Sequence, residues 1–158
     1  MDIAQIFTNH HAEIFRYLFI RTGSVETAED LSSEVFLKLV KEQAKYDPMR
    51  SGIRTWLYLL ARNLLADHFS RAKHQQPLEL QDFTDLAAQG DAAEFVQDWL
   101  YIINLLRDLS PEDQELIVLR YVNDLSIRDI SRIKNKSYIS TKVATHRALK
   151  KLKQLANE

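Results

Sequence analysis

Histidine and carboxylate side chains in two parts of the chain are the residues that most resemble a catalytic or metal-binding set. His10 and Glu13 lie near the N-terminus, and Asp67 and His68 are neighbours further along. Together they would bind a metal ion or support hydrolysis, but their spacing matches no catalytic pattern. The chain has no Cys, which excludes disulfides, thiolate zinc sites and thiol nucleophiles. We therefore expect no catalytic residue, metal or cofactor, and keep an enzyme only as one alternative.

The strongest chemical signal is positive charge concentrated between Arg128 and Lys153. This stretch holds nine Lys or Arg residues and one acid, in a chain whose net charge is −1. Apolar residues recur there at helical spacing in two segments, and Ser126 and Ser137 stand where N-caps are needed. A short helix, a tight turn at 134–136 and a longer basic helix predict a helix-turn-helix, whose second helix lies in the DNA major groove.

In the second of these helices we expect apolar residues on the packing face and basic residues on the opposite face. The expected packing residues are Ile139, Val143, Leu149 and Leu152. The expected basic residues are Lys142, Arg147, Lys150, Lys151 and Lys153. A solvated basic face is the alternative explanation, because positive charge at a helix C-terminus also suits the helix dipole.

Three helices are predicted in the first half of the chain, over residues 2–21, 24–43 and 51–73. The second has an acidic edge with apolar residues close by, which is either a solvated face or a docking surface for another protein. Pro48 and Gly52 interrupt the helical pattern before the third. Residues 45–73 mix basic groups with aromatic rings, a combination suited to single-stranded nucleic acid.

An acidic segment separates the two halves. Residues 78–98 contain six acids and no Lys or Arg, with Pro77 just before them. The fold class we predict is all-α: two small helical domains, residues 1–74 and 95–158, joined by a flexible acidic linker at 75–94. The C-terminal domain is expected to be a four-helix domain that contains the helix-turn-helix.

Length and hydropathy add further limits. The 158 residues are 46% hydrophobic, which is enough for packed cores. The N-terminus lacks the basic start and apolar core of a signal peptide. No apolar run approaches the roughly 18 residues that span a bilayer. Together with the absence of Cys, this predicts a cytoplasmic protein without direct membrane insertion.

Four motifs, in order along the chain, resemble one protein family. Residues 28–38, AEDLSSEVFLK, resemble the AEDLxQEVFL signature of bacterial sigma factors of the extracytoplasmic-function (ECF) group. Residues 55–68, TWLYLLARNLLADH, resemble that family's TWLYRIARNLxxDHxR stretch. Residues 109–121 resemble its LSPxxRxvxxLRY opening, and residues 146–152 match its HRALKKL ending.

The resemblance implies three binding surfaces. The first domain would bind core RNA polymerase through Asp30, Ser33, Glu34, Phe36 and Leu37. It would recognise and melt the minus-ten promoter element through Tyr46, Arg50, Arg62, Asn63, Asp67, His68 and Arg71. The second domain would read the minus-thirty-five element through Ser140, Lys142, Val143, His146, Arg147 and Lys150. Ser33 stands where the family usually has Gln, and the turn at 134–137 lacks the family's common Gly.

The resemblance implies three partners: core RNA polymerase, promoter DNA and an anti-sigma factor. The polymerase would be bound through its clamp coiled coil and flap, and the anti-sigma factor is often membrane-anchored in this family. The resemblance also implies a specificity subunit that performs no chemistry itself. The main alternative is a dimeric helix-turn-helix regulator, which would act on duplex operators without forming a holoenzyme.

Overall fold

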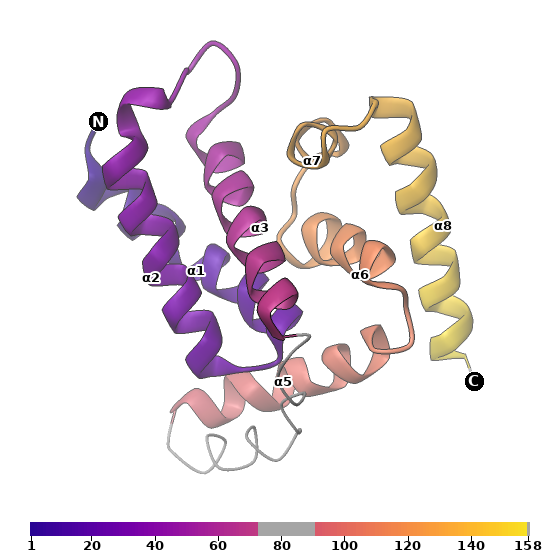
Figure 1. The fold of residues 1–158 in the computed structure, drawn as a ribbon. Helices are drawn as coiled ribbons and strands as arrows, with labels where there is room; N and C mark the ends of the chain where they lie inside the picture. The colour runs from indigo at the N-terminus through magenta and orange to yellow at the C-terminus, as the bar shows by residue number, and fades with distance from the viewer. Residues whose placement is uncertain (73–90, 158) are drawn as a thin grey trace. The chain divides into compact units, whose positions relative to one another are not determined.

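The computed structural model describes residues 1–72 and 91–157, with side chains from Trp99 onward in the second part. The chain divides into two compact units, residues 1–77 and 78–158. All regular structure in the described residues is helical (Figure 1), which confirms the all-α prediction. The predicted linker lies mostly outside the described residues. Its last part, residues 91–94, lies at the start of the helix α5 (Asp91–Leu106).

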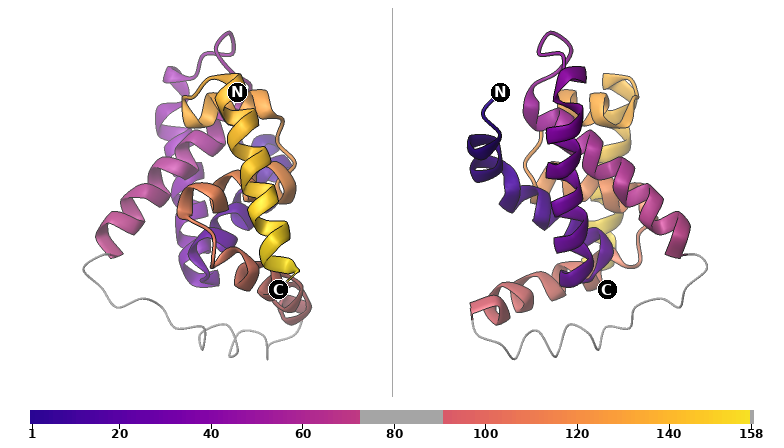
Figure 2. Two further views of the ribbon diagram at one scale, coloured as in Figure 1. Left: turned by 90° about the vertical axis from the view of Figure 1, so that its right-hand side faces the viewer. Right: turned by 60° about the vertical axis from the view of Figure 1, so that its left-hand side comes forward.

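The first unit consists of three helices, α1 (Ile3–Thr22), α2 (Val25–Glu42) and α3 (Ile53–Ala72). Each of them contacts the other two, as the views in Figures 1 and 2 show. The buried side chains include Ile14, Tyr17, Leu18 and Phe19 from α1, Ala28, Leu31, Val35 and Leu39 from α2, and Leu57, Tyr58, Leu60 and Ala61 from α3. In the sequence, the helical spacing of Ala28, Leu31, Val35 and Leu39 indicates this buried stripe of α2.

Local capping sets where α1 ends and α2 begins. Gly23 has φ 72°, a left-handed conformation that glycine adopts without a Cβ penalty, and its N–H donates to the Phe19 carbonyl at 2.8 Å. Ser24 is then the N-cap of α2, because its hydroxyl accepts from the Thr27 N–H at 3.2 Å. This tight connection determines which side of α2 faces solvent.

The connection from α2 to α3 is a short 3₁₀ turn, η1 (Gln43–Lys45), followed by a loop that closes on itself. The Tyr46 hydroxyl donates to the Ser51 carbonyl at 3.2 Å, and the Met49 N–H donates to Asp47 Oδ1 at 2.9 Å. These bonds hold the loop in one conformation beside the start of α3.

The second unit contains α5 (Asp91–Leu106), α6 (Pro111–Ile117), α7 (Ile127–Lys134) and α8 (Tyr138–Ala156). The helix α6 continues as a π-helical turn, η2 (Val118–Val122). Contacts of α8 with α5, α6 and α7 assemble the unit. The four-helix domain with a helix-turn-helix is confirmed.

Polar residues set where the two helices of the helix-turn-helix begin and where the turn between them lies. Ser126 caps α7 by accepting from the Asp129 N–H at 3.1 Å, and Ser137 caps α8 by accepting from the Ser140 N–H at 3.1 Å. Asn135, between them, has φ 53° and ψ 49°. Asn tolerates this left-handed conformation better than most residues, so the turn forms without the Gly that is usual in the family.

The packing face of α8 differs from the one predicted. The buried residues are Thr141, Thr145 and Ala148, whereas Ile139 is 74% exposed and Val143 is 42% exposed. The two threonine hydroxyls donate to carbonyls one turn earlier, at 2.8 and 2.7 Å, so their burial leaves those groups satisfied. Of the four apolar residues expected on this face, Leu149 and Leu152 are half-buried, and the expectation fails for Ile139 and Val143.

Lys134 is likewise not the polar turn residue that the sequence suggested. Its side chain is only 4% exposed, and Nζ lies 2.9 Å from Glu115 Oε1 and 2.9 Å from Glu112 Oε1. Glu115 is itself buried, with 7% of its side chain exposed. This buried ion pair ties the end of α7 to α6. Lys134 therefore does not contribute positive charge to an exposed DNA-facing surface.

Candidate nucleic-acid and protein interfaces

The acidic edge predicted on α2 is exposed. Asp30, Ser33, Glu34 and Leu37 all face solvent, and Leu37 is 57% exposed. Phe36 differs from these residues, because it is only 7% exposed and packs edge-on against the Phe7 ring at a centroid distance of 5.0 Å. Phe36 is a core residue that holds the edge in place, and a partner would contact the residues beside it.

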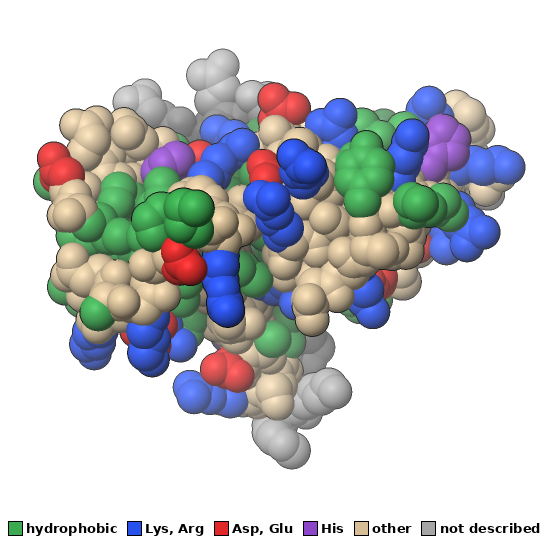
Figure 3. Space-filling view, turned by 90° about the horizontal axis from the view of Figure 1, so that it is seen from above, with side chains coloured by type: hydrophobic (Ala, Val, Ile, Leu, Met, Phe, Trp, Pro, Cys, Tyr) green, Lys and Arg blue, Asp and Glu red, His purple; other side chains and the backbone are tan. Residues whose placement is uncertain are grey.

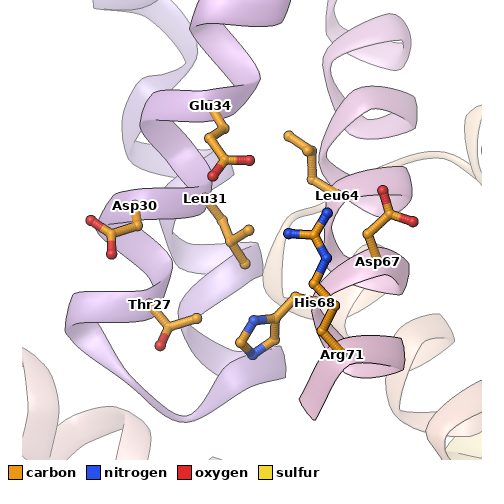
Figure 4. A pocket seen from close by; sticks show the side chains of 8 residues that line it. All are labelled: Thr27, Asp30, Leu31, Glu34, Leu64, Asp67, His68 and Arg71. Carbon is orange, nitrogen blue, oxygen red and sulfur yellow. The ribbon is translucent and has the colours of Figure 1, made fainter. Parts of the chain in front are cut away.

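A pocket of about 240 Å³ lies between α2 and α3. Its lining residues are Thr27, Asp30, Leu31, Glu34, Leu64, Asp67, His68 and Arg71. In Figure 4 the side chains of Glu34, His68 and Arg71 point toward the space between the two helices, while Asp30 and Asp67 lie at its outer sides. The structure thus brings together residues that the sequence assigned to two separate surfaces, one for polymerase and one for DNA.

A second hollow, of about 410 Å³, lies beside the α2–α3 loop. It is lined by Met1, Asp2, Gln5, Ile6, Tyr46, Pro48 and Ile53. The ring of Tyr46 lies 5.3 Å from that of Trp56, between ring centroids, and both residues are only partly exposed. An apolar hollow with an aromatic wall is a suitable place for a flat, unstacked base.

The remaining residues predicted on the minus-ten surface are solvent-accessible to different degrees. Arg50 extends from the loop with 89% of its side chain exposed, and its Nε lies 4.0 Å from the Asp47 carboxylate. Asn63 is exposed on α3, and Arg62 is half-buried. An exposed Asn offers both a donor and an acceptor to a base edge.

Glu13 connects α1 to α3 rather than serving a catalytic set. Its Oε1 accepts from Arg54 Nε at 2.8 Å and from the Tyr58 hydroxyl at 2.7 Å, and its Oε2 lies 2.9 Å from His10 Nδ1. Burial acts to raise the pKa of Glu13, but the hydrogen bonds from His10, Tyr58 and Arg54 outweigh it and hold this pKa below its ordinary value.

The four residues of the enzyme alternative do not form one cluster. His10 and Glu13 belong to the network on Arg54 and Tyr58, whereas Asp67 and His68 line the pocket between α2 and α3. Within residues 1–72 and 91–157, no group of three His, Asp or Glu side chains is arranged to hold a metal ion.

The second helix of the helix-turn-helix carries the exposed basic surface. The six residues predicted to contact the minus-thirty-five element are all exposed: Ser140, Lys142, Val143, His146, Arg147 and Lys150. Lys151 lies 3.0 Å from Asp113 at the start of α6, so part of its charge is already balanced. The surface that a major groove would meet is therefore the N-terminal and central part of α8.

Sequence reasoning did not identify several residues of these surfaces. Thr27 and Leu31 of α2 and Leu64 of α3 line the same pocket as the charged residues. Ile6 of α1 and Met1, which precedes that helix, line the hollow at the loop. No sequence pattern assigns these residues to a pocket, because they approach one another only when the helices pack. Ile139 was assigned to a core and is a surface residue.

Comparison with known families identifies both units. Residues 6–75 match the model of sigma-70 region 2, and residues 99–152 match the model of sigma-70 region 4. No helix in the part of the chain that the structure describes has the length and hydropathy of a membrane span.

Curated relatives match along most of this chain. The ECF RNA polymerase sigma factor BldN of Streptomyces coelicolor is 27% identical over 155 residues, which cover 96% of this chain and 59% of BldN. The ECF RNA polymerase sigma factor SigM of Bacillus subtilis is 28% identical over 164 residues, which cover 99% of this chain and 96% of SigM. The chain thus spans little more than half the length of BldN and nearly all of SigM.

Two solved structures share the fold. The sigma factor RpoE of Bartonella quintana, solved with the anti-sigma factor NepR, matches with a TM-score of 0.72 and 19% identity, covering 99% of this chain and 97% of RpoE. CnrH, solved with the cytosolic domain of CnrY, matches with a TM-score of 0.77 and 17% identity, covering 98% of this chain and 87% of CnrH. With both regions present in order and ECF sigma factors among its relatives, the chain belongs to the sigma-70 family, as an RNA polymerase sigma factor of the ECF group.

Proposed function

We propose that this sigma factor binds core RNA polymerase, directs it to specific promoters and promotes DNA opening. One observation carries the proposal: a single chain presents an exposed acidic edge on α2 and an exposed basic recognition helix, α8, within the two sigma-70 regions in their usual order. The first surface suits a protein partner, and the second suits DNA.

The proposed polymerase contact is the edge of α2 formed by Asp30, Ser33, Glu34 and Leu37. Two exposed carboxylates next to an exposed Leu offer charge for steering and apolar area for affinity. Phe36 is buried beneath this edge and holds α2 against α1 through its ring contact with Phe7. The expected partner surface is a basic helix pair, such as the clamp coiled coil of the polymerase, with the flap as a further contact for the second unit.

The proposed minus-ten surface combines the loop around Tyr46 with α3. The apolar hollow beside Tyr46 would receive an unstacked base, and the exposed Asn63 would bind a base edge. Arg50, Arg62 and Arg71 would bind the backbone. Because such a site binds a single strand better than a duplex, it shifts the promoter toward the open state without chemistry on the DNA.

The proposed minus-thirty-five surface is the exposed side of α8. Arg147 and Lys142 have the donors that recognise guanine edges, and Lys150 is placed further along the helix, where phosphate contacts are expected. Asp67 and His68 line the pocket of the first unit, and we assign them to the proposed minus-ten surface.

The proposed domain assignment is residues 1–74 for polymerase binding and melting, 75–94 as a tether whose last four residues are the start of α5, and 95–158 for minus-thirty-five recognition. The tether raises the effective concentration of the second domain once the first has bound. We further propose a cytoplasmic protein that is not an enzyme, needs no cofactor, and is restrained by an anti-sigma factor that covers the polymerase or DNA surfaces.

A pull-down with purified bacterial core RNA polymerase tests the proposal. The wild-type chain is expected to bind, and Glu34→Lys is expected to reduce binding because it reverses a charge on the proposed contact edge. Glu26→Lys is the matched control, since Glu26 is exposed in the first turn of the same helix and outside the proposed contact set. Failure to bind polymerase, together with tight binding to a palindromic duplex, would favour the dimeric regulator instead.

A further inference from the structure

The recognition helix α8 exposes two aliphatic side chains that its own packing does not use. Ile139 is 74% exposed and Val143 is 42% exposed, although both are β-branched hydrophobic residues. They lie four residues apart, and therefore on one side of the helix. The face that packs into the unit is built instead from Thr141, Thr145 and Ala148. In the N-terminal half of this helix, hydroxyl-bearing residues are thus buried and aliphatic residues are exposed, which is the reverse of the usual amphipathic arrangement.

The surroundings of this aliphatic pair are basic. Lys142, His146 and Arg147 are exposed on the same helix within one turn of Val143, and Lys136 is exposed just before the helix begins. Figure 3 shows hydrophobic side chains among Lys, Arg and His side chains over this end of the helix-turn-helix. Positive charge around a small apolar patch favours a polyanion with apolar groups of its own, which describes the DNA major groove.

The position of the pair on the helix also fits base reading. Ile139 is the second residue of α8, directly after Tyr138 and the N-cap Ser137. In a helix-turn-helix, the N-terminal residues of the recognition helix contact base edges. Aliphatic side chains have no hydrogen-bond donor or acceptor. Polar groups on adenine, guanine and cytosine edges would therefore lose hydrogen bonds to water against them and gain none in return. The thymine C5 methyl is the apolar group that a major groove offers.

We propose that Ile139 and Val143 contact the methyl groups of thymines in the minus-thirty-five element, and so select thymine there. The proposal rests on the function proposed above, in which α8 reads that element. Four residues of helix advance by about 6 Å, and successive bases on a strand are about 3.4 Å apart. The two thymines are therefore expected about two base pairs from each other.

Replacing thymine by deoxyuridine tests the contact directly, because it removes the methyl group and leaves the pairing edge unchanged. Duplexes would first be selected from a random library by holoenzyme reconstituted from the full chain and core polymerase. Each thymine of the minus-thirty-five element in the selected duplexes would then be replaced in turn by deoxyuridine. For each position, the ratio of the affinity for the thymine duplex to the affinity for the deoxyuridine duplex would be measured. At two positions we expect binding to weaken about fourfold, which corresponds to about 0.8 kcal/mol for one buried methyl group.

Variants of the two residues assign the contacts. Ile139→Ser and Val143→Ser should each bring the ratio close to one at a single position and leave the other position unchanged. Val40→Ser is the matched control, because Val40 is 46% exposed but lies on α2. It should keep both ratios. The ratio is taken within each variant, so differences in the amount of holoenzyme cancel.

The outcomes separate this inference from the proposed function. Sequence-selective binding with ratios near one at every thymine would overturn the methyl contacts and leave the sigma-factor function standing; the aliphatic pair would then serve a protein partner. Absence of any selected sequence would overturn the proposed promoter recognition and the methyl contacts with it.

Discussion

Replacing Lys134 by Met is expected to destabilise the second unit strongly. The change removes an ammonium group that lies 2.9 Å from the buried carboxylate of Glu115. Removing one member of a buried ion pair typically costs about 3–5 kcal/mol, because the remaining charge stays in a poorly hydrated place. Glu112 also lies 2.9 Å from Lys134 but is 65% exposed, so water replaces the lysine at that carboxylate at little cost.

Urea unfolding followed by tryptophan fluorescence measures this loss. The chain has two Trp residues, Trp56 in the first unit and Trp99 in the second, so a Trp56→Phe background reports on the second unit alone. With a denaturant slope of about 1–3 kcal/mol per M, the expected loss moves the midpoint by about 1 M or more. The double variant Lys134→Met/Glu115→Leu should recover most of the stability, since both charges are then gone.

Lys151→Met is the matched control for this experiment. It removes the ammonium that lies 3.0 Å from Asp113, in a pair whose lysine is 59% exposed, and such surface pairs contribute at most about 1 kcal/mol. If Lys134→Met costs no more than Lys151→Met, the buried pair is not what holds α7 against α6, and the reasoning fails. A double variant less stable than Lys134→Met would refute it equally.

Two further predictions concern local electrostatics and backbone conformation. Because the pKa of Glu13 is below its ordinary value of 4.5, the ionised carboxylate stabilises the first unit fully above about pH 4.5, and this stabilisation is lost as the pH falls through the folded-state pKa. Glu13→Gln should therefore make the stability of the first unit depend less on pH in this acid range, measured by Trp56 fluorescence in a Trp99→Phe background. An unchanged pH dependence would contradict the role of the network. Asn135→Ala should destabilise the second unit by about 1–2 kcal/mol, because residue 135 has φ 53°, whereas Asn135→Gly should not destabilise it. If both variants lower the free energy of unfolding in urea equally, the left-handed conformation is not the contribution of Asn135.

Local sequence determined much of the helical framework of this protein. Ser126 and Ser137 are N-caps as their positions predicted, because capping depends on groups only three residues away. The apolar spacing of α2 also identified its buried stripe, including Leu31 and Val35. In these cases the deciding interactions lie within one or two turns of helix and are visible in the order of residues.

Tertiary structure decided where the sequence offered two readings of one residue type. Lys134 was read as a polar turn residue and is buried, because Glu115 reaches it from α6, nineteen positions earlier in the chain. Ile139 was expected on the packing face and is exposed, because α8 packs through Thr141 and Thr145. Val143 was expected both on that face and among the minus-thirty-five contacts, and it is also exposed. Helical spacing identifies residues that share a face but does not say which face meets a neighbour.

The two candidate surfaces of the first unit show the same division. Sequence alone identified Asp30 and Glu34 as one group and Asp67, His68 and Arg71 as another. Only the packing of α2 against α3 places members of both groups around one pocket. The chemistry of each side chain was readable in the sequence, whereas the distance between residues more than thirty positions apart in the chain depends on how the buried faces of their helices fit.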